Sequence, residues 1–122
     1  MSTTTTSIQA LDEALNQQIL AGDILGAFEK YYAEDVEMQE NSSPSTKGKA
    51  ANFAREKAFV ESVEQFHGAR VLSSAVNGNR TFSEWELDAT YKGAGRFVLR
   101  QVAVREWKDG EIVREQFYYN KG

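Results

Sequence analysis

The stretch FVLRQVAVREWKDGEIVREQFYY, residues 97–119, decides the fold of this chain. Two segments rich in Val, Phe and Tyr flank the dipeptide Asp109-Gly110. Asp and Gly tolerate the positive φ of a two-residue turn, so this dipeptide between two β-prone segments is a strong hairpin signal. The stretch therefore predicts a β-hairpin in which Lys108 faces Glu111.

Side chains alternate between the two faces of a strand, so the turn also predicts which residues lie together. A regular register pairs Val104 with Glu115, Val102 with Phe117 and Arg100 with Tyr119. The face they share is mostly apolar but carries the charges of Arg100 and Glu115. This indicates a wet or ligand-filled hollow behind the sheet, because buried charges are costly unless they are paired. The opposite face is mixed, as expected of a face that is solvated or covered by a partner; it holds Leu99, Gln101, Ala103, Arg105, Trp107, Ile112, Arg114, Gln116 and Tyr118.

The composition fits a single globular domain. The chain has 122 residues, of which 41% are hydrophobic and 26% charged, and this balance disfavours both disorder and membrane spanning. The net charge of −4 argues against a general nucleic-acid binder, which would carry a basic patch for the phosphates. With no Cys and a single His, His67, no metal site and no disulfide framework are expected. Since the start also lacks a signal-peptide pattern, the cytoplasm is the expected compartment.

The rest of the chain alternates between helical and extended patterns. Thr6 with Gln9 fits a capping box ahead of a helix, and Asp23 can cap a second helix. Residues 1–6 are expected to be a disordered tail ahead of a single domain at 7–122. The expected elements are helices at 7–21 and 23–35, a strand at 36–40, a loop containing Pro44, a helix at 49–66, and strands at 69–76 and 81–91 before the hairpin. This order predicts an α+β fold with three N-terminal helices packed in a strongly curved, mostly antiparallel sheet.

Three short motifs within this order resemble the nuclear transport factor 2-like superfamily and, within it, the SnoaL-like group. They are AGD at 21–23, YYAEDV at 31–36 and WKDGEIVRE at 107–115. The resemblance covers nearly the whole chain and implies a cone-shaped fold, in which the bent sheet wraps around the helices and leaves a pocket. It also implies that the outer sheet face forms a homodimer. That fold hosts isomerases, cyclases, dehydratases, epoxide hydrolases and binding modules, so the resemblance does not by itself imply one activity.

The catalytic patterns of such relatives are only partly present. Resemblance to ketosteroid isomerases puts Glu40 at the general-base position, but the two oxyanion-donor positions hold Leu15 and Val102. Resemblance to limonene epoxide hydrolases matches Arg100 to the arginine of their relay, with Val102 in place of the neighbouring acid. SnoaL-like cyclases use a late His and Asp, and residues 110–122 contain neither.

Three charged residues each have a functional and a structural interpretation. Glu40 is either a pocket base in apolar surroundings or a surface residue at the end of a short strand. Arg100 either clamps an anionic group of a ligand or pairs with Glu115 or a helix carboxylate, so Glu115 is either its structural partner or a second acid. We expect Glu40 and Arg100 to point into the same hollow, where direct contact would make the pair an anchor rather than a catalytic unit.

Other candidates are equally open to two interpretations. Trp85 is either a pocket wall or an ordinary core aromatic, and Tyr119 either donates a hydrogen bond into the pocket or is a core tyrosine. His67, at the expected end of the third helix, is a cap or a catalytic group. The charged face of that helix, with Arg55 and Glu56, is expected to be solvated.

The expected function is the binding of a small organic molecule in a mainly apolar pocket, without a cofactor. One alternative is a cofactor-independent isomerase or lyase that uses Glu40 as its base, and another is an interaction module whose cone is filled. The expected pocket residues are Met38, Trp85, Arg100, Val102, Glu115, Phe117 and Tyr119.

A homodimer is expected through the mixed face of the hairpin. On a monomer, Leu99, Trp107, Ile112 and Tyr118 would form an exposed apolar patch there. Burial of that patch against a second copy is the simplest explanation of its composition.

Overall fold

The computed structural model describes residues 7–120, so the tail expected at 1–6 lies outside the described residues. The helices are α1 (Ile8–Leu20), α2 (Ile24–Tyr31) and α3 (Lys49–Ser62). The strands are β1 (Tyr32–Glu40), β2 (Thr46–Lys47), β3 (Val63–Asn77), β4 (Arg80–Tyr91), β5 (Gly95–Lys108) and β6 (Glu111–Tyr119). Three helices packed against one sheet confirm the predicted α+β class. None of the helices described is long and apolar enough to cross a membrane.

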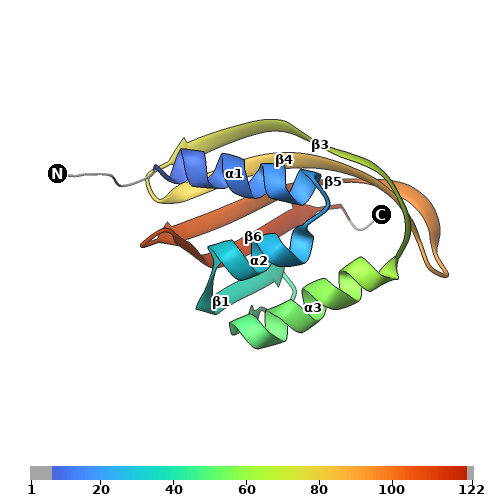
Figure 1. Cartoon of the computed structure of the whole chain (residues 1–122), viewed down its shortest axis with the longest axis horizontal. Coiled ribbons are helices and arrows are strands. Elements are labelled where there is room, and N and C mark those ends of the chain that lie inside the picture. The colour runs from blue at the N-terminus through green and yellow to red at the C-terminus, as the bar shows by residue number, and fades with distance from the viewer. Residues whose placement is uncertain (1–6, 121–122) are drawn as a thin grey trace.

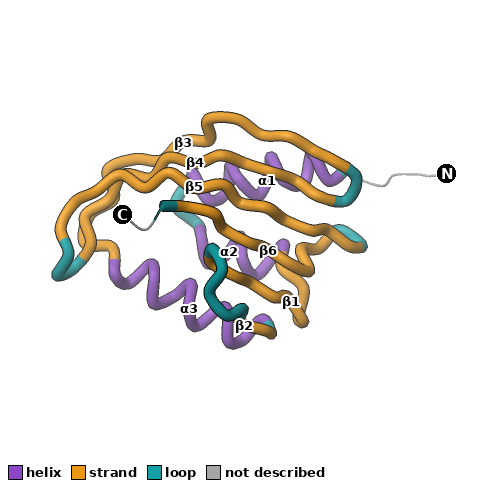
Figure 2. Tube along the Cα trace, turned by 180° about the vertical axis from the view of Figure 1, so that it is seen from behind, coloured by secondary structure: helices purple, strands orange, loops and turns teal. Residues whose placement is uncertain are grey.

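The six strands form one curved sheet in the order β2-β1-β6-β5-β4-β3. Strand β1 pairs with β6 in parallel, and the other neighbours are antiparallel, so the sheet is mostly antiparallel as predicted. The long strands β3, β4 and β5 arch past the helices, which cover the concave face (Figure 1). Seen from behind, the convex face carries no helix (Figure 2). The short strand β2 lies where the sequence predicted only a loop.

Polar side chains begin the first two helices. The Ser7 hydroxyl accepts a hydrogen bond from the Ala10 amide at 3.2 Å, so Ser7 caps α1. Asp23 caps α2 as predicted, since its carboxylate accepts from the Gly26 amide at 3.0 Å. In both cases a side chain satisfies an amide that has no partner within the helix.

Helix α3 ends earlier than its sequence pattern predicts. It stops at Ser62, and β3 begins at Val63, which pairs with Tyr91 of β4. The β-branched Val63 is compatible with either state, and pairing with the sheet decides in favour of the strand. His67 therefore lies within a strand, where its Nε2 is 2.8 Å from the Thr90 hydroxyl, and its expected position at a helix end is wrong.

The hairpin turn is confirmed, but its register changes just beyond it. Lys108 faces Glu111, and both Asp109 (φ 52°) and Gly110 (φ 79°) have positive φ. After the Trp107–Ile112 pair, Val113 is an extra residue in β6, which is a β-bulge. From there on Glu115 faces Arg105, so the predicted Val104–Glu115 pair is wrong.

A second one-residue difference lies at the other end of β5. Tyr91 pairs with Gly95, so three residues rather than the expected two form the turn between β4 and β5. Trp85 consequently faces Gln101. The two differences invert β5 and leave the faces of β4 as predicted, and in β6 those of Glu115, Phe117 and Tyr119, whereas Ile112, before the bulge, lies on the concave face instead of the convex one. The concave face of β5 holds Leu99, Gln101, Ala103, Arg105 and Trp107, and its convex face holds Val98, Arg100, Val102 and Val104.

The apolar core lies between the helices and the concave face of the sheet. It contains Leu15, Ala27, Phe28, Tyr31, Tyr32, Val36, Met38, Trp107 and Ile112. Trp107 and Ile112 are 3% and 0% exposed, and the Trp107 indole N–H donates to the Thr81 hydroxyl at 2.9 Å. The expected exposed patch with these two residues is therefore wrong.

Candidate functional site

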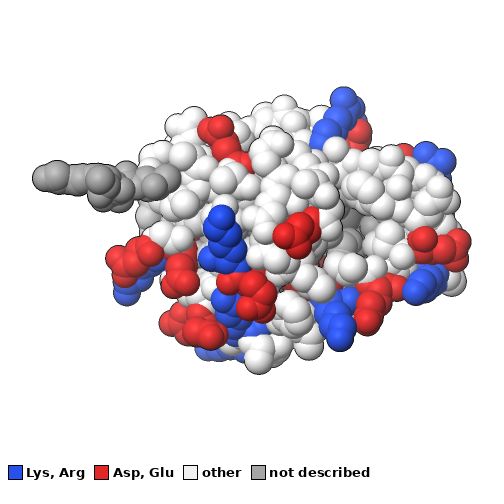
Figure 3. Space-filling view, in the orientation of Figure 1, with Lys and Arg blue, Asp and Glu red and all other residues white. Residues whose placement is uncertain are grey.

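The concave side of the sheet contains a cavity of about 390 Å³. Most of its walls are apolar: the helices contribute Leu15, Phe28 and Phe59, and the strands contribute Trp85, Leu99 and Phe117. The space-filling view shows a recess between α3 and the arching strands, on the face that the helices occupy (Figure 3). The cavity thus lies between the concave sheet face and the helices.

Not all expected pocket residues reach this cavity. Met38, Glu40, Trp85, Glu115, Phe117 and Tyr119 line it. Arg100 and Val102 do not, because the inversion of β5 turns them to the convex face. Arg100 pairs there with Glu86 at 2.7 Å, and 63% of its side chain is exposed. The expectations that Arg100 shares a hollow with Glu40 or pairs with Glu115 are wrong.

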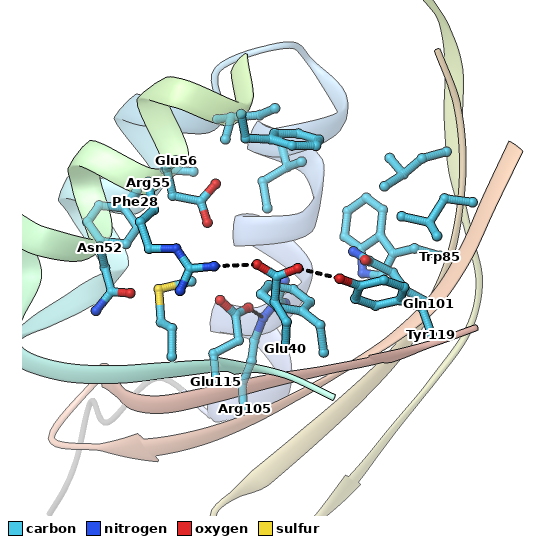
Figure 4. Close-up of a pocket in the computed structure, with 18 of the residues that line it drawn as sticks. Phe28, Glu40, Asn52, Arg55, Glu56, Trp85, Gln101, Arg105, Glu115 and Tyr119 are labelled. Atoms are coloured by element: carbon cyan, nitrogen blue, oxygen red, sulfur yellow. Dashed lines mark hydrogen bonds and ion pairs between the residues drawn. The ribbon is translucent and has the colours of Figure 1, made fainter. Parts of the chain in front are cut away.

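Both carboxylate oxygens of Glu40 are engaged. Arg55 of α3 donates to one oxygen at 2.6 Å, and the Tyr119 hydroxyl donates to the other. These three side chains form a row across the cavity (Figure 4). Burial and the hydrogen bond to Glu40 raise the pKa of Tyr119 to about 12, so this phenol stays protonated. Arg55 also donates to the Thr46 hydroxyl at 2.7 Å, which fixes the guanidinium.

The floor of the cavity is a buried polar network centred on Arg105. Its guanidinium donates to Glu115 at 2.7 Å, to Asp12 at 2.8 Å and to Asn16 at 2.7 Å. The Tyr32 hydroxyl donates to the second oxygen of Glu115 at 2.7 Å, and burial together with the Glu115 charge raises the pKa of Tyr32 well above its usual value. Each of these side chains is at most 5% exposed. Such a satisfied network fixes the floor rather than offering free groups.

Glu56 differs from the other carboxylates of the cavity. It projects from α3 toward the middle of the cavity (Figure 4), and no hydrogen bond or ion pair joins it to another described residue. Burial, followed by the negative charges of Glu115 and Glu40, raises the pKa of Glu56 to about 7. The sequence analysis placed Glu56 on the solvated face of the helix, whereas it lines the cavity. The available signal was its spacing, because Glu56 falls three residues after Phe53 and four before Val60, on the same face of the helix.

Gln101 is another polar side chain of the cavity lining without a hydrogen-bond partner among the described residues. It lines the cavity beside Trp85 and Tyr119 (Figure 4). The Trp85 indole N–H is already engaged with the Ser83 hydroxyl at 2.9 Å. The polar groups that a molecule in the cavity would find unused therefore include the amide of Gln101 and the carboxyl of Glu56.

Several solved structures are similar to this chain. A candidate SnoaL-like polyketide cyclase from Mesorhizobium loti, whose name also includes carbohydrate phosphatase, is 30% identical, with a TM-score of 0.85 over 93% of this chain and 100% of that chain. A candidate polyketide cyclase from Pseudomonas putida is 25% identical, with a TM-score of 0.79 over 96% and 94% of the two chains. A protein of unknown function with a cystatin-like fold from Xanthomonas campestris, 16% identical with a TM-score of 0.83 over 95% and 92%, is alike in fold alone.

None of the curated proteins matches the chain. The family model of the SnoaL-like domain, however, matches residues 3–119, which is nearly the full length. The cone-shaped architecture, the cavity and the similarity to the Mesorhizobium loti protein agree with that match. The chain therefore belongs to the SnoaL-like domain family.

Proposed function

We propose that this protein binds a small, mainly apolar organic molecule in the cavity of the cone. The observation that carries the proposal is a volume of about 390 Å³ whose mostly apolar walls hold a few unused polar groups, among them Glu56 and Gln101. Ligand pockets of proteins typically have this character, with few polar groups set among apolar walls. The open volume argues against the alternative of an interaction module with a filled cone.

Two of the similar structures support an oxygenated polycyclic ligand. The proteins from Mesorhizobium loti and Pseudomonas putida are named as candidate polyketide cyclases. Aromatic polyketide-like compounds combine apolar rings with hydroxyl and carbonyl groups, which suits walls such as Phe28 and Phe117 and the free amide of Gln101. These compounds are therefore the first set to screen.

A second candidate function is a cofactor-independent isomerase or lyase. Glu40, the base expected from the sequence, has both oxygens engaged by Arg55 and Tyr119, which favours an anchoring role. Glu56 is unpartnered and has a pKa of about 7, which suits a group that gives and takes protons near neutrality. If the protein is an enzyme, Glu56→Gln should lower kcat by about 10²- to 10⁴-fold, and Glu40→Gln should act mainly on KM.

The binding proposal can be tested with the intrinsic fluorescence of Trp85. This residue is 3% exposed and lines the cavity, so an occupant should change its emission. Trp85→Phe should remove the response without removing binding. Leu99→Trp should fill the cavity and abolish binding, whereas Val98→Trp, on the opposite face of the same strand, should leave it unchanged. Equal binding by these last two variants, or no binding by any polyketide-like or other apolar compound, would reject the proposal.

We also propose a homodimer through the convex sheet face, with a different set of residues from the one expected. Phe82 faces Val104 across β4 and β5, and Val102 faces Tyr118 across β5 and β6. These four apolar side chains, here called the outer patch, point away from the cavity. Tyr118 is 48% exposed, as expected of a residue that a partner would cover.

A further inference from the structure

The charges around the cavity are not balanced. Arg55 and Arg105 are the cationic side chains among its described lining residues. Arg55 is engaged by Glu40 and Thr46, and Arg105 by Glu115, Asp12 and Asn16, so the charge of each guanidinium is already paired with a carboxylate. A carboxylate or phosphate ligand would have to leave water without gaining a positive partner, which is unfavourable in a mostly apolar cavity.

Carboxylates, by contrast, are in excess. Glu40, Glu56 and Glu115 line the cavity, and Asp12 lies behind Arg105. Four carboxylates thus share two guanidinium groups, and the one without a counter-charge is Glu56. A positive charge placed beside Glu56 would gain an ion pair in a partly desolvated site, where such pairs are stronger than at the surface.

The walls are also suited to a cation. Phe28, Phe59, Trp85, Tyr91, Phe97 and Phe117 surround the volume that Glu56 enters. Aromatic ring faces attract ammonium groups, most strongly when the ammonium is desolvated. The same rings bury the apolar body of a ligand, so the walls favour a molecule with one charged end and a large apolar part.

We propose that the cavity takes an organic monocation, namely an amine with an aromatic or alicyclic body, whose ammonium group lies against the Glu56 carboxylate. This inference rests on the proposed binding function and names the class of ligand. The apolar body would fill the space between the aromatic side chains, and Gln101 could hydrogen-bond a polar substituent at its other end.

Binding of such a cation should depend on pH. Glu56 has a pKa of about 7 in the empty cavity, so the ammonium must displace its proton below that pH, and the affinity should rise as pH increases through 7. Between pH 5 and pH 8 the rise should be up to about 100-fold. The charged and titratable groups that face Glu56 are Asp12 on α1, Arg55 on α3, Tyr32 and Glu40 on β1, Tyr91 on β4, Arg105 on β5, and Glu115 and Tyr119 on β6. The pKa values of the tyrosines Tyr32, Tyr91 and Tyr119 and of Arg105 are raised, so these groups do not titrate in this range.

Three probes with one apolar body separate the effect of charge from that of shape. They are 2-(1-naphthyl)ethylamine, 2-(1-naphthyl)ethanol and 1-naphthylacetate, a cation, a neutral molecule and an anion at neutral pH. Isothermal titration calorimetry at pH 8 should show that the amine binds at least about tenfold more tightly than the alcohol, with the acetate weakest. Buffers of different ionisation enthalpy should show proton release on amine binding at pH 6.5.

Two variants of α3 provide the matched comparison. Glu56→Gln should remove the preference for the amine and its pH dependence while keeping the affinity for the alcohol within about threefold. Glu61→Gln makes the same chemical change at an exposed position outside the cavity and should behave as the wild type. Thermal unfolding of both variants checks that each is folded.

The outcomes that overturn the inference are distinct from those that overturn the proposed function. Equal affinity for amine and alcohol, or an amine preference that survives in Glu56→Gln, rejects the cationic ligand and leaves small-molecule binding intact. Tighter binding of the acetate also rejects it. Absence of binding by all three probes rejects the cationic ligand as well, and the Trp85 fluorescence screen then decides on its own whether the cavity binds any small molecule.

Discussion

Arg105 and Glu115 lie directly opposite each other on β5 and β6, and the Arg105 Nε donates to a Glu115 carboxylate oxygen at 2.7 Å. The pair exists because Val113 is an extra residue in β6. Through the same guanidinium, Asp12 and Asn16 attach α1 to the sheet. One buried side chain therefore joins a helix to two strands beneath the cavity.

Removal of Arg105 should be strongly destabilising. Arg105→Met would leave Glu115 and Asp12 buried without their positive partner, at a cost of about 3 to 5 kcal/mol in the free energy of unfolding. Arg100→Met, which breaks an exposed pair with Glu86, should cost no more than about 1 kcal/mol. Urea unfolding measures both values. A reversed order would contradict the face assignment of β5.

Trp107→Glu should prevent folding. The side chain is buried in the apolar core, and an unpaired carboxylate there would lose both the packing and the hydrogen bond to Thr81. Val98→Glu, at a site that is 55% exposed, should keep a native near-ultraviolet circular dichroism spectrum. Native spectra for both variants would show that Trp107 is not a core residue.

Glu56→Gln should stabilise the protein in a pH-dependent manner. The pKa of Glu56 is raised from 4.5 to about 7 by folding, so the native state binds more protons between these values and stability falls as pH rises through them. The glutamine variant lacks this loss. The difference between its free energy of unfolding and that of the wild type should therefore be about 2 to 3 kcal/mol larger at pH 8 than at pH 5. Urea unfolding at the two pH values tests this, with exposed Glu61→Gln as the control. A difference in the free energy of unfolding that does not change with pH would mean that Glu56 is not desolvated.

Asn52→Asp should destabilise the connection between β1 and α3. The Asn52 amide nitrogen shares its two hydrogens among three carbonyl oxygens, those of Val36 at 3.3 Å, Thr46 at 2.9 Å and Gly48 at 2.9 Å. A carboxylate cannot donate to these oxygens and would repel them, so a loss of about 3 kcal/mol is expected. Ala51→Asp, at the exposed neighbouring position, should have little effect. Equal unfolding midpoints for the two variants would contradict this role.

Tyr118→Glu should convert the proposed dimer into a monomer. The substitution places a charge in the outer patch beside Val102 without touching the cavity. Light scattering at micromolar concentration should give a dimer mass for the wild type and for a control, Lys108→Glu, in the exposed hairpin turn. A wild-type monomer under these conditions would reject the dimer.

The sequence predicted the fold class and most elements because hydrophobic periodicity and turn residues are local signals. The sequence did not predict which side chains of β5 face the cavity. The three-residue turn after Tyr91 and the bulge at Val113 each shift the register of strand pairing by one residue. A shift by one exchanges the two faces of a strand. Arg105 and Trp107 thus lie inside and Arg100 outside, although their composition alone gives no reason for this choice.

The candidate site was predicted in part for the same reason. Glu40, Glu115 and Tyr119 line the cavity because the faces of β1 and β6 follow directly from alternation. Glu56 was missed because a carboxylate on a charged helix is usually solvated. Its raised pKa comes from burial and from the negative charge of Glu115, a residue far away in the sequence, and no local pattern reveals either cause.

The parallel pairing of β1 with β6 has a consequence for how the chain reaches its native state. Tyr32 and Glu115 are hydrogen-bonded partners 83 residues apart, so the cone closes only when nearly the whole chain has been assembled. Contacts of such high separation slow folding, because loop-closure entropy is lost before the contact forms. During synthesis β1 must therefore wait for β6, so the part of the core that lies between these two strands and the helices forms late.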